Sequence, residues 1–244
     1  MQEQTGSGEG RGRLAVIIGG ANGIGAATAR CLAGHGWQVA VADLDEAAAH
    51  ETARHCGGQA YAVDVRDAES IEHTAQAIEA RQGPVFALVS AAAIFAPRMA
   101  PEKLPVADWD RIVSIGYRGT YLCNVAFAQR MARQGAGAIV NISSMVGQRP
   151  NHGHAYYSAK AAVNMLTEGM AGEWGRSGVR VNAVSPGFVA VPRMLDNIRD
   201  GQRYAVSPAE VSALGRLVEP AEVAETIAFP VSYTHLTLPT TPYV

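Results

Sequence analysis

Short apolar runs rich in β-branched residues alternate along the chain with longer alanine-rich stretches that are apolar on one face. The short runs predict buried strands, because they are too uniformly apolar for a sheet with one face in water. The longer stretches predict helices that cover both faces of the sheet. The expected strands are residues 14–18, 38–42, 60–65, 85–90, 137–144 and 179–185, and the expected helices are 24–36, 45–56, 67–82, 108–133, 155–174 and 219–229. This alternation predicts an α/β fold of three layers, built on a doubly wound parallel sheet within a single domain.

Composition and charge narrow the class of protein. The chain has 244 residues, of which 48% are hydrophobic, and a net charge of −2. This balance argues against a nucleic acid or a membrane surface as a partner, and no apolar run reaches the roughly 18 residues that span a bilayer. Residues 1–12 are polar and glycine-rich, so we expect a disordered tail rather than a signal peptide. We expect a cytoplasmic protein with its one domain at residues 13–229.

The three cysteines, Cys31, Cys56 and Cys123, are far apart along the chain and show no spacing typical of metal ligands. They are expected to be unpaired thiols in a reducing compartment. The sequence therefore predicts no metal site.

A glycine-rich turn, GGANGIG, directly follows the first expected strand and precedes a helix. Gly19, Gly23 and Gly25 allow a tight turn and a close approach of a pyrophosphate, and the helix that follows offers its N–H groups to the phosphates. Asp43 ends the second expected strand, where a carboxylate accepts hydrogen bonds from an adenosine ribose and repels a 2′-phosphate. NAD is therefore favoured over NADP. The alternative is that Asp43 caps the helix that follows.

The stretch HAYYSAK, residues 154–160, places two tyrosines three and four residues before Lys160. Residues four apart on a helix lie on one face, so Tyr156 is the neighbour of Lys160, while Tyr157 lies about 100° further round. A phenol with a pKa of about 10 is a poor acid or base at neutral pH, but a nearby ammonium group favours its ionised form. The pair is therefore suited to proton transfer.

Five segments together resemble the classical short-chain dehydrogenase/reductase family over residues 12–229: GGANGIG, VDV, GAIVNISSMVG, YYSAK and VNAVSPG. The resemblance implies a Rossmann-type fold and an NAD-dependent oxidoreductase that interconverts a secondary alcohol and a ketone by hydride transfer. It selects Tyr156 as the general acid/base, Lys160 as the group that lowers the tyrosine pKa and holds the nicotinamide ribose, and Ser144 as the donor to the substrate oxygen. Ser143 is an alternative to Ser144, because the spacing from Ser144 to Tyr156 is one residue shorter than in many members. A cap at the end of the strand is the other interpretation of Ser144.

The resemblance also implies a cofactor site assembled from several segments of the chain. Asp64 is expected at the adenine edge, and a plain turn is the equal alternative. The residues expected to contact the cofactor are Gly19, Asn22, Gly23, Ile24, Gly25, Asp43, Asp64, Val65, Ala91, Tyr156, Lys160, Pro186, Gly187 and Val189.

Four positions depart from the family pattern. Ile18 replaces a threonine, residues 90–93 read SAAA in place of Asn-Asn-Ala-Gly, Gly116 replaces an asparagine, and Val191 replaces a threonine. Gly116 keeps the backbone carbonyl that in the family binds a water on the lysine, but it loses side-chain hydrogen bonds, and a lost buried partner costs about 1–3 kcal/mol. Val191 cannot hydrogen-bond the nicotinamide carboxamide. We therefore expect weaker cofactor ordering, and the rival hypothesis is a dinucleotide-binding protein with little or no catalysis.

The substrate side of the sequence is less informative. Residues 188–214 are expected to form a substrate loop, and sugar alcohols, hydroxy-steroids, aromatic alcohols and 3-oxoacyl thioesters all remain open as substrates. His152 and His154 precede the expected catalytic helix and either line the substrate pocket or lie on a solvated loop. Two histidines without a third ligand do not predict a metal site.

The last fifteen residues, 230–244, lack the strand and glycine pair that end the family pattern, and their three prolines oppose a central strand. They are interpreted as a non-native segment or as an unusual C-terminal arm. The resemblance implies a homo-oligomer, dimer or tetramer. We expect a dimer through the two long helices, whose apolar residues include Val125, Phe127, Val163 and Met170.

Overall fold

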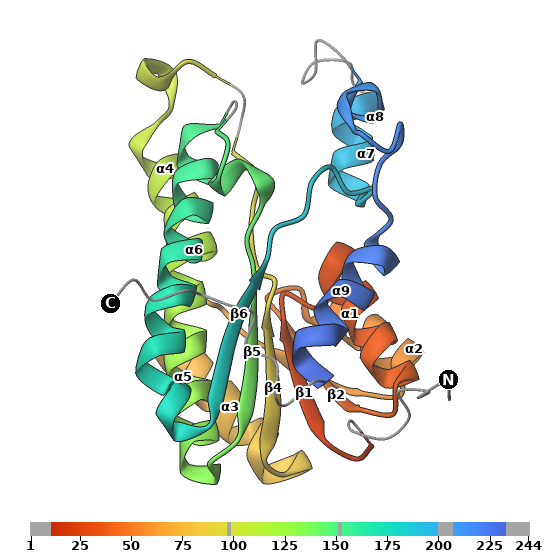
Figure 1. Ribbon diagram of the computed structural model, residues 1–244, viewed down its shortest axis with the longest axis vertical. Helices are drawn as coiled ribbons and strands as arrows, with labels where there is room; N and C mark the ends of the chain where they lie inside the picture. The colour runs from red at the N-terminus through yellow and green to blue at the C-terminus, as the bar shows by residue number, and fades with distance from the viewer. Residues whose placement is uncertain (1–10, 97–98, 151–152, 200–206, 233–244) are drawn as a thin grey trace, which may run out of the picture.

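One parallel sheet of six strands forms the centre of the molecule, in the order β3-β2-β1-β4-β5-β6 (Figure 1). The structure is a computed structural model and describes residues 11–96, 99–150, 153–199 and 207–232. The strands are β1 (Leu14–Ile18), β2 (Gln38–Asp43), β3 (Gln59–Ala62), β4 (Val85–Ser90), β5 (Gly137–Ile142) and β6 (Val179–Val184). The predicted doubly wound parallel sheet is confirmed.

The order of the strands reverses at β1, which pairs with β2 on one side and with β4 on the other. The connections from β1 and from β4 therefore leave in opposite directions and open a crevice at the carboxyl ends of these strands. Ligands of doubly wound folds bind in this crevice.

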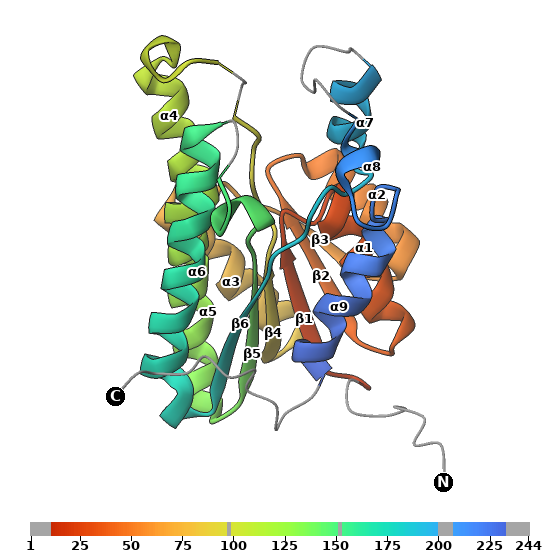
Figure 2. The ribbon, with the colours of Figure 1, turned by 45° about the horizontal axis from the view of Figure 1, so that its top comes forward.

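Helices cover both faces of the sheet (Figures 1 and 2). One layer contains α1 (Gly23–Gly34), α2 (Glu46–Cys56) and α9 (Pro220–Ser232), and the other contains α3 (Ala68–Gln82), α5 (Gly119–Gln134) and α6 (His154–Trp174). Beyond the carboxyl edge of the sheet lie α7 (Pro192–Arg199) and α8 (Pro208–Val211). The remaining helical segments are α4 (Val106–Val113), the π-helix η2 (Ser114–Arg118) and the 3₁₀ turns η1 (Pro101–Lys103), η3 (Met145–Gly147) and η4 (Gly175–Ser177). None of the helices in the described part of the chain is both long and apolar enough to cross a membrane.

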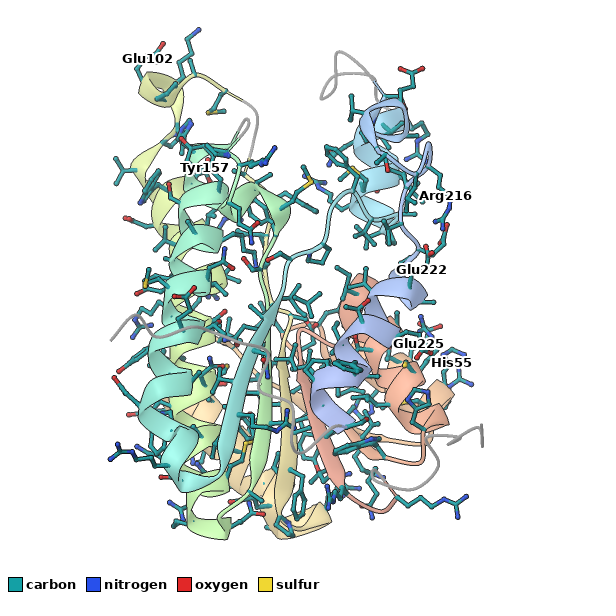
Figure 3. All side chains as sticks on the ribbon, in the orientation of Figure 1. His55, Glu102, Tyr157, Arg216, Glu222 and Glu225 are labelled. Atoms are coloured by element: carbon teal, nitrogen blue, oxygen red, sulfur yellow. The ribbon has the colours of Figure 1, made fainter. Side chains whose placement is uncertain are left out.

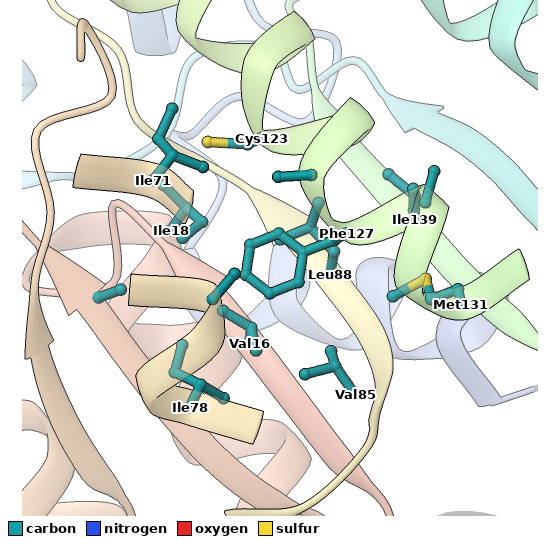
Figure 4. Packing of buried hydrophobic residues seen from close by; sticks show 14 of the residues in the cluster. Val16, Ile18, Ile71, Ile78, Val85, Leu88, Cys123, Phe127, Met131 and Ile139 are labelled. Atoms are coloured by element: carbon teal, nitrogen blue, oxygen red, sulfur yellow. The ribbon is translucent and has the colours of Figure 1, made fainter. Parts of the chain in front are cut away.

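Side chains alternate along each strand and so build two separate cores. Leu14, Val16 and Ile18 of β1 pack against one helical layer, while Ala15 and Ile17 pack against the other. In the first core the Phe127 ring of α5 lies among aliphatic side chains from the sheet and from α3 (Figure 4). A strand buried on both faces is uniformly apolar for this reason.

The apolar residues expected to form a dimer interface are already covered within one chain. Phe127 and Val163 are 0% exposed and Met170 is 5% exposed. Only Val125 of the four is partly exposed. The expectation that these residues exceed what one core can cover is therefore wrong, because three of them are buried within the single chain.

The predicted helix at 108–133 is three consecutive segments: α4, the π-helix η2 and α5. Gly116 lies buried in the middle of the π-helix. A π-helical turn adds a residue to the helix and is common at functional sites. The departure from the family pattern at Gly116 thus falls on a local irregularity of the helix.

Two predicted boundaries differ from the structure in ways that matter for the site. The third strand ends at Ala62, so Asp64 lies in the turn that follows, and the fifth strand ends at Ile142, so both serines of the pair follow it. At the C-terminus α9 continues to Ser232, and Pro230 and Val231 are buried. The expected start of an atypical tail at residue 230 is therefore too early, and residues 233–244 lie outside the described residues.

Candidate active site

A cavity of about 680 Å³ opens at the carboxyl ends of the central strands. This volume lies in the range of small-molecule and cofactor sites. Its wall includes the glycine loop, the ends of β2 and β4, the segment after β5, the first turn of α6 and the chain after β6.

The glycine loop leaves no room for side chains at several of its positions, of which Gly19 and Gly25 are the tightest. A Cβ atom at Gly19, where φ is +76°, would collide with the backbone nitrogen of Ala92. A Cβ atom at Gly25 would collide with the carbonyl oxygen of Gly19. Glycine is therefore required for the strand, the turn and the start of α1 to pack together, and the N–H groups at the start of α1 line the cavity.

Asp43 is held by two backbone groups and lines the cavity. Its Oδ2 accepts a hydrogen bond from the N–H of Ala21 at 3.0 Å, and its Oδ1 accepts one from the N–H of Asp45 at 3.1 Å. The residue that caps α2 is Asp45, whose Oδ1 accepts from the N–H of Ala48 at 3.0 Å. The alternative interpretation of Asp43 as the helix cap is therefore wrong.

Asp64 also lines the cavity, where it forms an ion pair with Arg66. Arg66 Nη2 lies 2.6 Å from Asp64 Oδ2, and the N–H of Arg66 donates to Oδ1 at 2.9 Å. The Arg66 guanidinium holds the pKa of the Asp64 carboxyl below its usual value. Asp64 is thus an ionised turn aspartate at the wall of the cavity.

Tyr156 lies in the first turn of α6 and its side chain lines the cavity, whereas Tyr157 does not line it. The Phe95 ring packs against Tyr156 with ring centroids 5.5 Å apart. Tyr157 lies near the upper end of α6 (Figure 3). The helical geometry thus separates the two tyrosines as the spacing predicts.

Lys160 is 2% exposed and lies one turn after Tyr156. Its Nζ donates a hydrogen bond to the carbonyl oxygen of Ile142 at 2.6 Å and lies 5.7 Å from the centroid of the Tyr156 ring. An ammonium group has three donors, so this bond leaves two for other partners. Burial lowers the pKa of Lys160 from 10.5 to about 8.

The two serines after β5 have different surroundings. Ser143 is 2% exposed, and its Oγ donates a hydrogen bond to the carbonyl oxygen of Lys160 at 3.0 Å. Ser144 Oγ accepts a long hydrogen bond, 3.4 Å, from the N–H of Val146 in the turn η3. Ser143 Oγ is committed to fastening β5 to α6, whereas the hydroxyl proton of Ser144 is not used by that bond.

Three of the departures from the family pattern have visible local surroundings. The carbonyl oxygen of Gly116 accepts a hydrogen bond from Thr120 Oγ1 at 3.1 Å. Ser90 Oγ donates to Asn124 Oδ1 at 3.2 Å, deep in the first core. Val191 lines the cavity beside Gly23, where its side chain is apolar.

All of the residues expected from the sequence to hold the cofactor, and Ser144, line this one cavity. Sequence reasoning missed two lining residues that carry no motif, Arg66 and Phe95, whereas Phe188, Arg193 and Met194 belong to the expected substrate loop. No local pattern distinguishes them from ordinary loop residues, and only the folding of distant segments brings them to the cavity.

The histidines do not form a wall of the cavity in the described part of the chain. His154 stacks on Trp109 of α4, with ring centroids 6.2 Å apart, and is not among the lining residues. The described part of the cavity therefore gives no support to a role of His154 in lining the substrate pocket. His152 lies outside the described residues.

Comparison with known proteins agrees with this geometry. A family model described as enoyl-(acyl carrier protein) reductase matches residues 19–235. Cis-4-hydroxycyclohexanecarboxylate dehydrogenase from Sinomonas cyclohexanicum is 39% identical over 229 residues, which cover 89% of this chain and 88% of that protein. D-threitol dehydrogenase from Mycolicibacterium smegmatis is 36% identical over 225 residues, covering 89% and 85% of the two chains.

Solved structures show the same fold over nearly the whole chain. A crystal structure named as ribose-5-phosphate isomerase from Brucella melitensis 16M superposes with a TM-score of 0.89 and 40% identity, over 92% of this chain and 88% of that one. Together with the glycine loop and the Tyr156–Lys160 pair, these matches define the class of protein. The chain belongs to the classical short-chain dehydrogenase/reductase family.

Proposed function

We propose that this chain is an NAD-dependent oxidoreductase that interconverts a secondary alcohol and a ketone. One observation carries the proposal: Ser144, Tyr156 and Lys160 line the same cavity as the glycine loop. The residue proposed to transfer protons therefore lies in the same cavity as the loop proposed to bind a dinucleotide.

The backbone of the glycine loop would hold the pyrophosphate. Gly19 and Gly25 leave the loop without side chains, and the N-terminus of α1 presents N–H groups and a partial positive charge. Asn22 is the N-cap residue, and its side chain makes no capping hydrogen bond. Its amide is therefore not used by its own helix, and the residue lines the cavity.

Charge at the other end of the cavity favours NAD over NADP. The N–H groups of Ala21 and Asp45 hold the Asp43 carboxylate in place, where it would accept hydrogen bonds from ribose hydroxyls and repel a 2′-phosphate. Arg66 is the cation nearest in sequence that lines the cavity, and its charge is matched by Asp64 at 2.6 Å. A 2′-phosphate would have to compete for that guanidinium.

Proton transfer is assigned to Tyr156. In the oxidative direction its phenolate oxygen takes the hydroxyl proton of the alcohol, and in the reductive direction the phenol returns a proton to the ketone oxygen. Ser144 Oγ donates a hydrogen bond to the same substrate oxygen. The chemistry that bound NAD⁺ would supply is acceptance of the hydride from the carbinol carbon.

Lys160 supports this step electrostatically. Its ammonium group lies on the cavity side of α6, where it favours the Tyr156 phenolate and can donate to ribose hydroxyls. Because burial lowers the lysine pKa to about 8, this positive charge declines above that pH. The bond from Nζ to Ile142 fixes the ammonium group against the end of β5.

The substrate side of the cavity favours a compact apolar body with an anionic group. Phe95, Met145, Phe188 and Met194 form an apolar wall, and Arg193 adds a guanidinium group. The relative from Sinomonas is named for a hydroxycyclohexane that carries a carboxylate, which has this combination of features. We therefore place hydroxylated alicyclic carboxylates first among the substrate classes, and we assign carboxylate binding to Arg193.

The test is a panel of secondary alcohols with NAD⁺, followed by the absorbance of the reduced nicotinamide. The panel pairs 4-hydroxycyclohexanecarboxylate with cyclohexanol, and a sugar alcohol and a 3-hydroxyacyl thioester are included. We expect turnover with the carboxylate-bearing ring at a lower KM than with cyclohexanol. In Arg193→Gln the KM for the carboxylate should rise while the KM for cyclohexanol and the Kd for NADH stay unchanged.

The rival function, dinucleotide binding without catalysis, has its own signature in this experiment. It predicts NADH binding with no turnover of any alcohol or of the matching ketones. An equal rise of both KM values in Arg193→Gln would contradict the assignment of that residue without contradicting the oxidoreductase function.

A further inference from the structure

The packing of α1 against α9 brings together three side chains that belong to none of the sequence motifs described above. Cys31 and His35 come from the end of α1, and Glu225 comes from the middle of α9. One ligand atom from each, Cys31 Sγ, a His35 ring nitrogen and a Glu225 carboxylate oxygen, lie within 4.8 Å of one another. None of the three lines the active-site cavity.

The backbone elements that hold these groups are well anchored. Cys31 and His35 are four residues apart, so they lie on one face of α1. Leu32 of α1 and Ile227 of α9 are both 0% exposed and belong to the same core. Figure 3 shows Glu225 on the side of α9 that faces α1. The cluster is thus built on two packed helices rather than on loops.

The three side chains are in contact with one another even while the Cys31 thiol carries its proton. His35 Nε2 lies 3.7 Å from Glu225 Oε2. Burial, and secondly the Glu225 carboxylate, raise the pKa of the Cys31 thiol to about 12. The three ligand atoms are therefore close enough together to share one ion.

We propose that Cys31, His35 and Glu225 bind a divalent transition-metal ion, with Zn²⁺ the best match. A thiolate, an imidazole nitrogen and a carboxylate oxygen are the ligand types of zinc sites. Bonds to zinc of about 2.0–2.3 Å place two ligand atoms of one ion less than about 4.6 Å apart. His35 and Glu225 are exposed, so a small side-chain rotation brings the set to that spacing, and a water completes four-coordination.

Binding is an exchange of one proton for one metal ion. The Cys31 thiol releases its proton to solvent, and the thiolate, the neutral imidazole and the carboxylate bind the ion without any change of oxidation state. The bound ion would tie α1, which starts at the glycine loop, to α9, which follows the segment over the cavity. Its role is therefore stabilisation of the fold and not chemistry on the substrate.

The experiment uses untagged full-length protein from which metal has been removed by a chelator. Co²⁺ serves as the spectroscopic probe and Zn²⁺ as the competitor. We expect one Co²⁺ per chain, a near-ultraviolet absorption from charge transfer between sulfur and cobalt, its loss on addition of Zn²⁺, and a Tm that rises with Zn²⁺ concentration.

Three variants decide which residues bind the ion. Cys31→Ser should abolish the charge-transfer absorption, and Glu225→Gln, a change at an exposed position, should weaken Co²⁺ binding by at least about tenfold. Cys56→Ser is the matched control, because Cys56 is also a half-buried thiol, beside His55 on α2. It should leave the absorption unchanged.

Three results would overturn the proposal: no saturable Co²⁺ binding by the wild-type chain, absorption retained in Cys31→Ser, or absorption lost in Cys56→Ser. Circular dichroism verifies that each variant is folded. NAD binding and alcohol oxidation are measured separately, so the outcome here is independent of the proposed oxidoreductase function.

Discussion

The two sides of the active-site cavity are constructed differently. On the proposed cofactor side the wall includes residues 19, 22–25, 43–44 and 63–66, and at Gly19 and Gly25 there is no room for a side chain. The substrate side combines segments around residues 95, 145 and 188–194, and its walls are side chains. A site made of backbone tolerates few changes of sequence, whereas a wall of side chains can be varied to fit another substrate.

Tyr156, at the border between the two sides, is expected to show the largest effect. Tyr156→Phe removes the proposed proton donor and acceptor and should lower kcat by about 10²–10⁴-fold, because general acid–base catalysis contributes that much. The Kd for NADH should stay unchanged. Tyr157→Phe, which alters a side chain outside the cavity, is the control and should retain most of the activity. The opposite pattern would move the catalytic role to Tyr157.

The backbone character of the cofactor side is tested by Gly25→Ala. The added Cβ would collide with the carbonyl oxygen of Gly19, so the turn must open, and NADH binding should be lost or weakened by more than about tenfold. Gly34→Ala is the matched control in the same helix, because a Cβ there meets nothing within 4 Å. Isothermal titration with NADH measures both, and equal affinities for the two variants would contradict the close packing of the loop.

Lys160, which lines the cavity, is expected to make the stability of the protein depend on pH. Its pKa in the folded chain, about 8, lies below its ordinary value of 10.5, so burial of the charge costs free energy below pH 8. The unfolded chain binds more protons than the folded chain between about pH 8 and 10.5, and stability therefore rises with pH across that window.

Lys160→Met removes this contribution. We compare the free energy of unfolding of the variant with that of wild type at each pH. The difference, variant minus wild type, should be largest below pH 8 and should decrease by up to about 3 kcal/mol towards pH 10.5, since one pKa unit corresponds to about 1.4 kcal/mol. Denaturant titrations at several pH values measure this slope. Lys103→Met, at an exposed position, should show no such slope. The lost bond to Ile142 shifts the absolute values but not the dependence on pH.

Gly116 is expected to show the smallest effect. A Cβ at this position meets only Ala159 Cβ at 4.0 Å, so the asparagine of the family pattern can be accommodated at its Cβ. Gly116→Asn should raise kcat by less than about tenfold if the side-chain hydrogen bonds around the lysine are restored, as one hydrogen bond contributes about 0.5–1.5 kcal/mol. Gly116→Ala is the control, because it changes helix propensity without adding an amide. An equal change of kcat in both variants would leave no role for the amide.

The fold was predictable because its rules are local. Strand, glycine turn and helix follow one another within residues 14–34, and the two apolar faces of each strand come directly from the alternation of side chains. The π-helix was not predicted, since Gly116 and its neighbours satisfy the ordinary periodicity of a helix.

The sequence by itself determined the sheet, the glycine loop, and the separation of Tyr156 from Tyr157, because each depends on spacing within a few residues. Tertiary structure decided which of two neighbouring aspartates caps α2, why Ser143 is committed to the backbone of α6, and which apolar residues are left exposed. It also brought Glu225 to Cys31 and His35 across some two hundred residues of chain. Such contacts arise from the packing of whole helices, and packing depends on every residue of the core rather than on any short pattern.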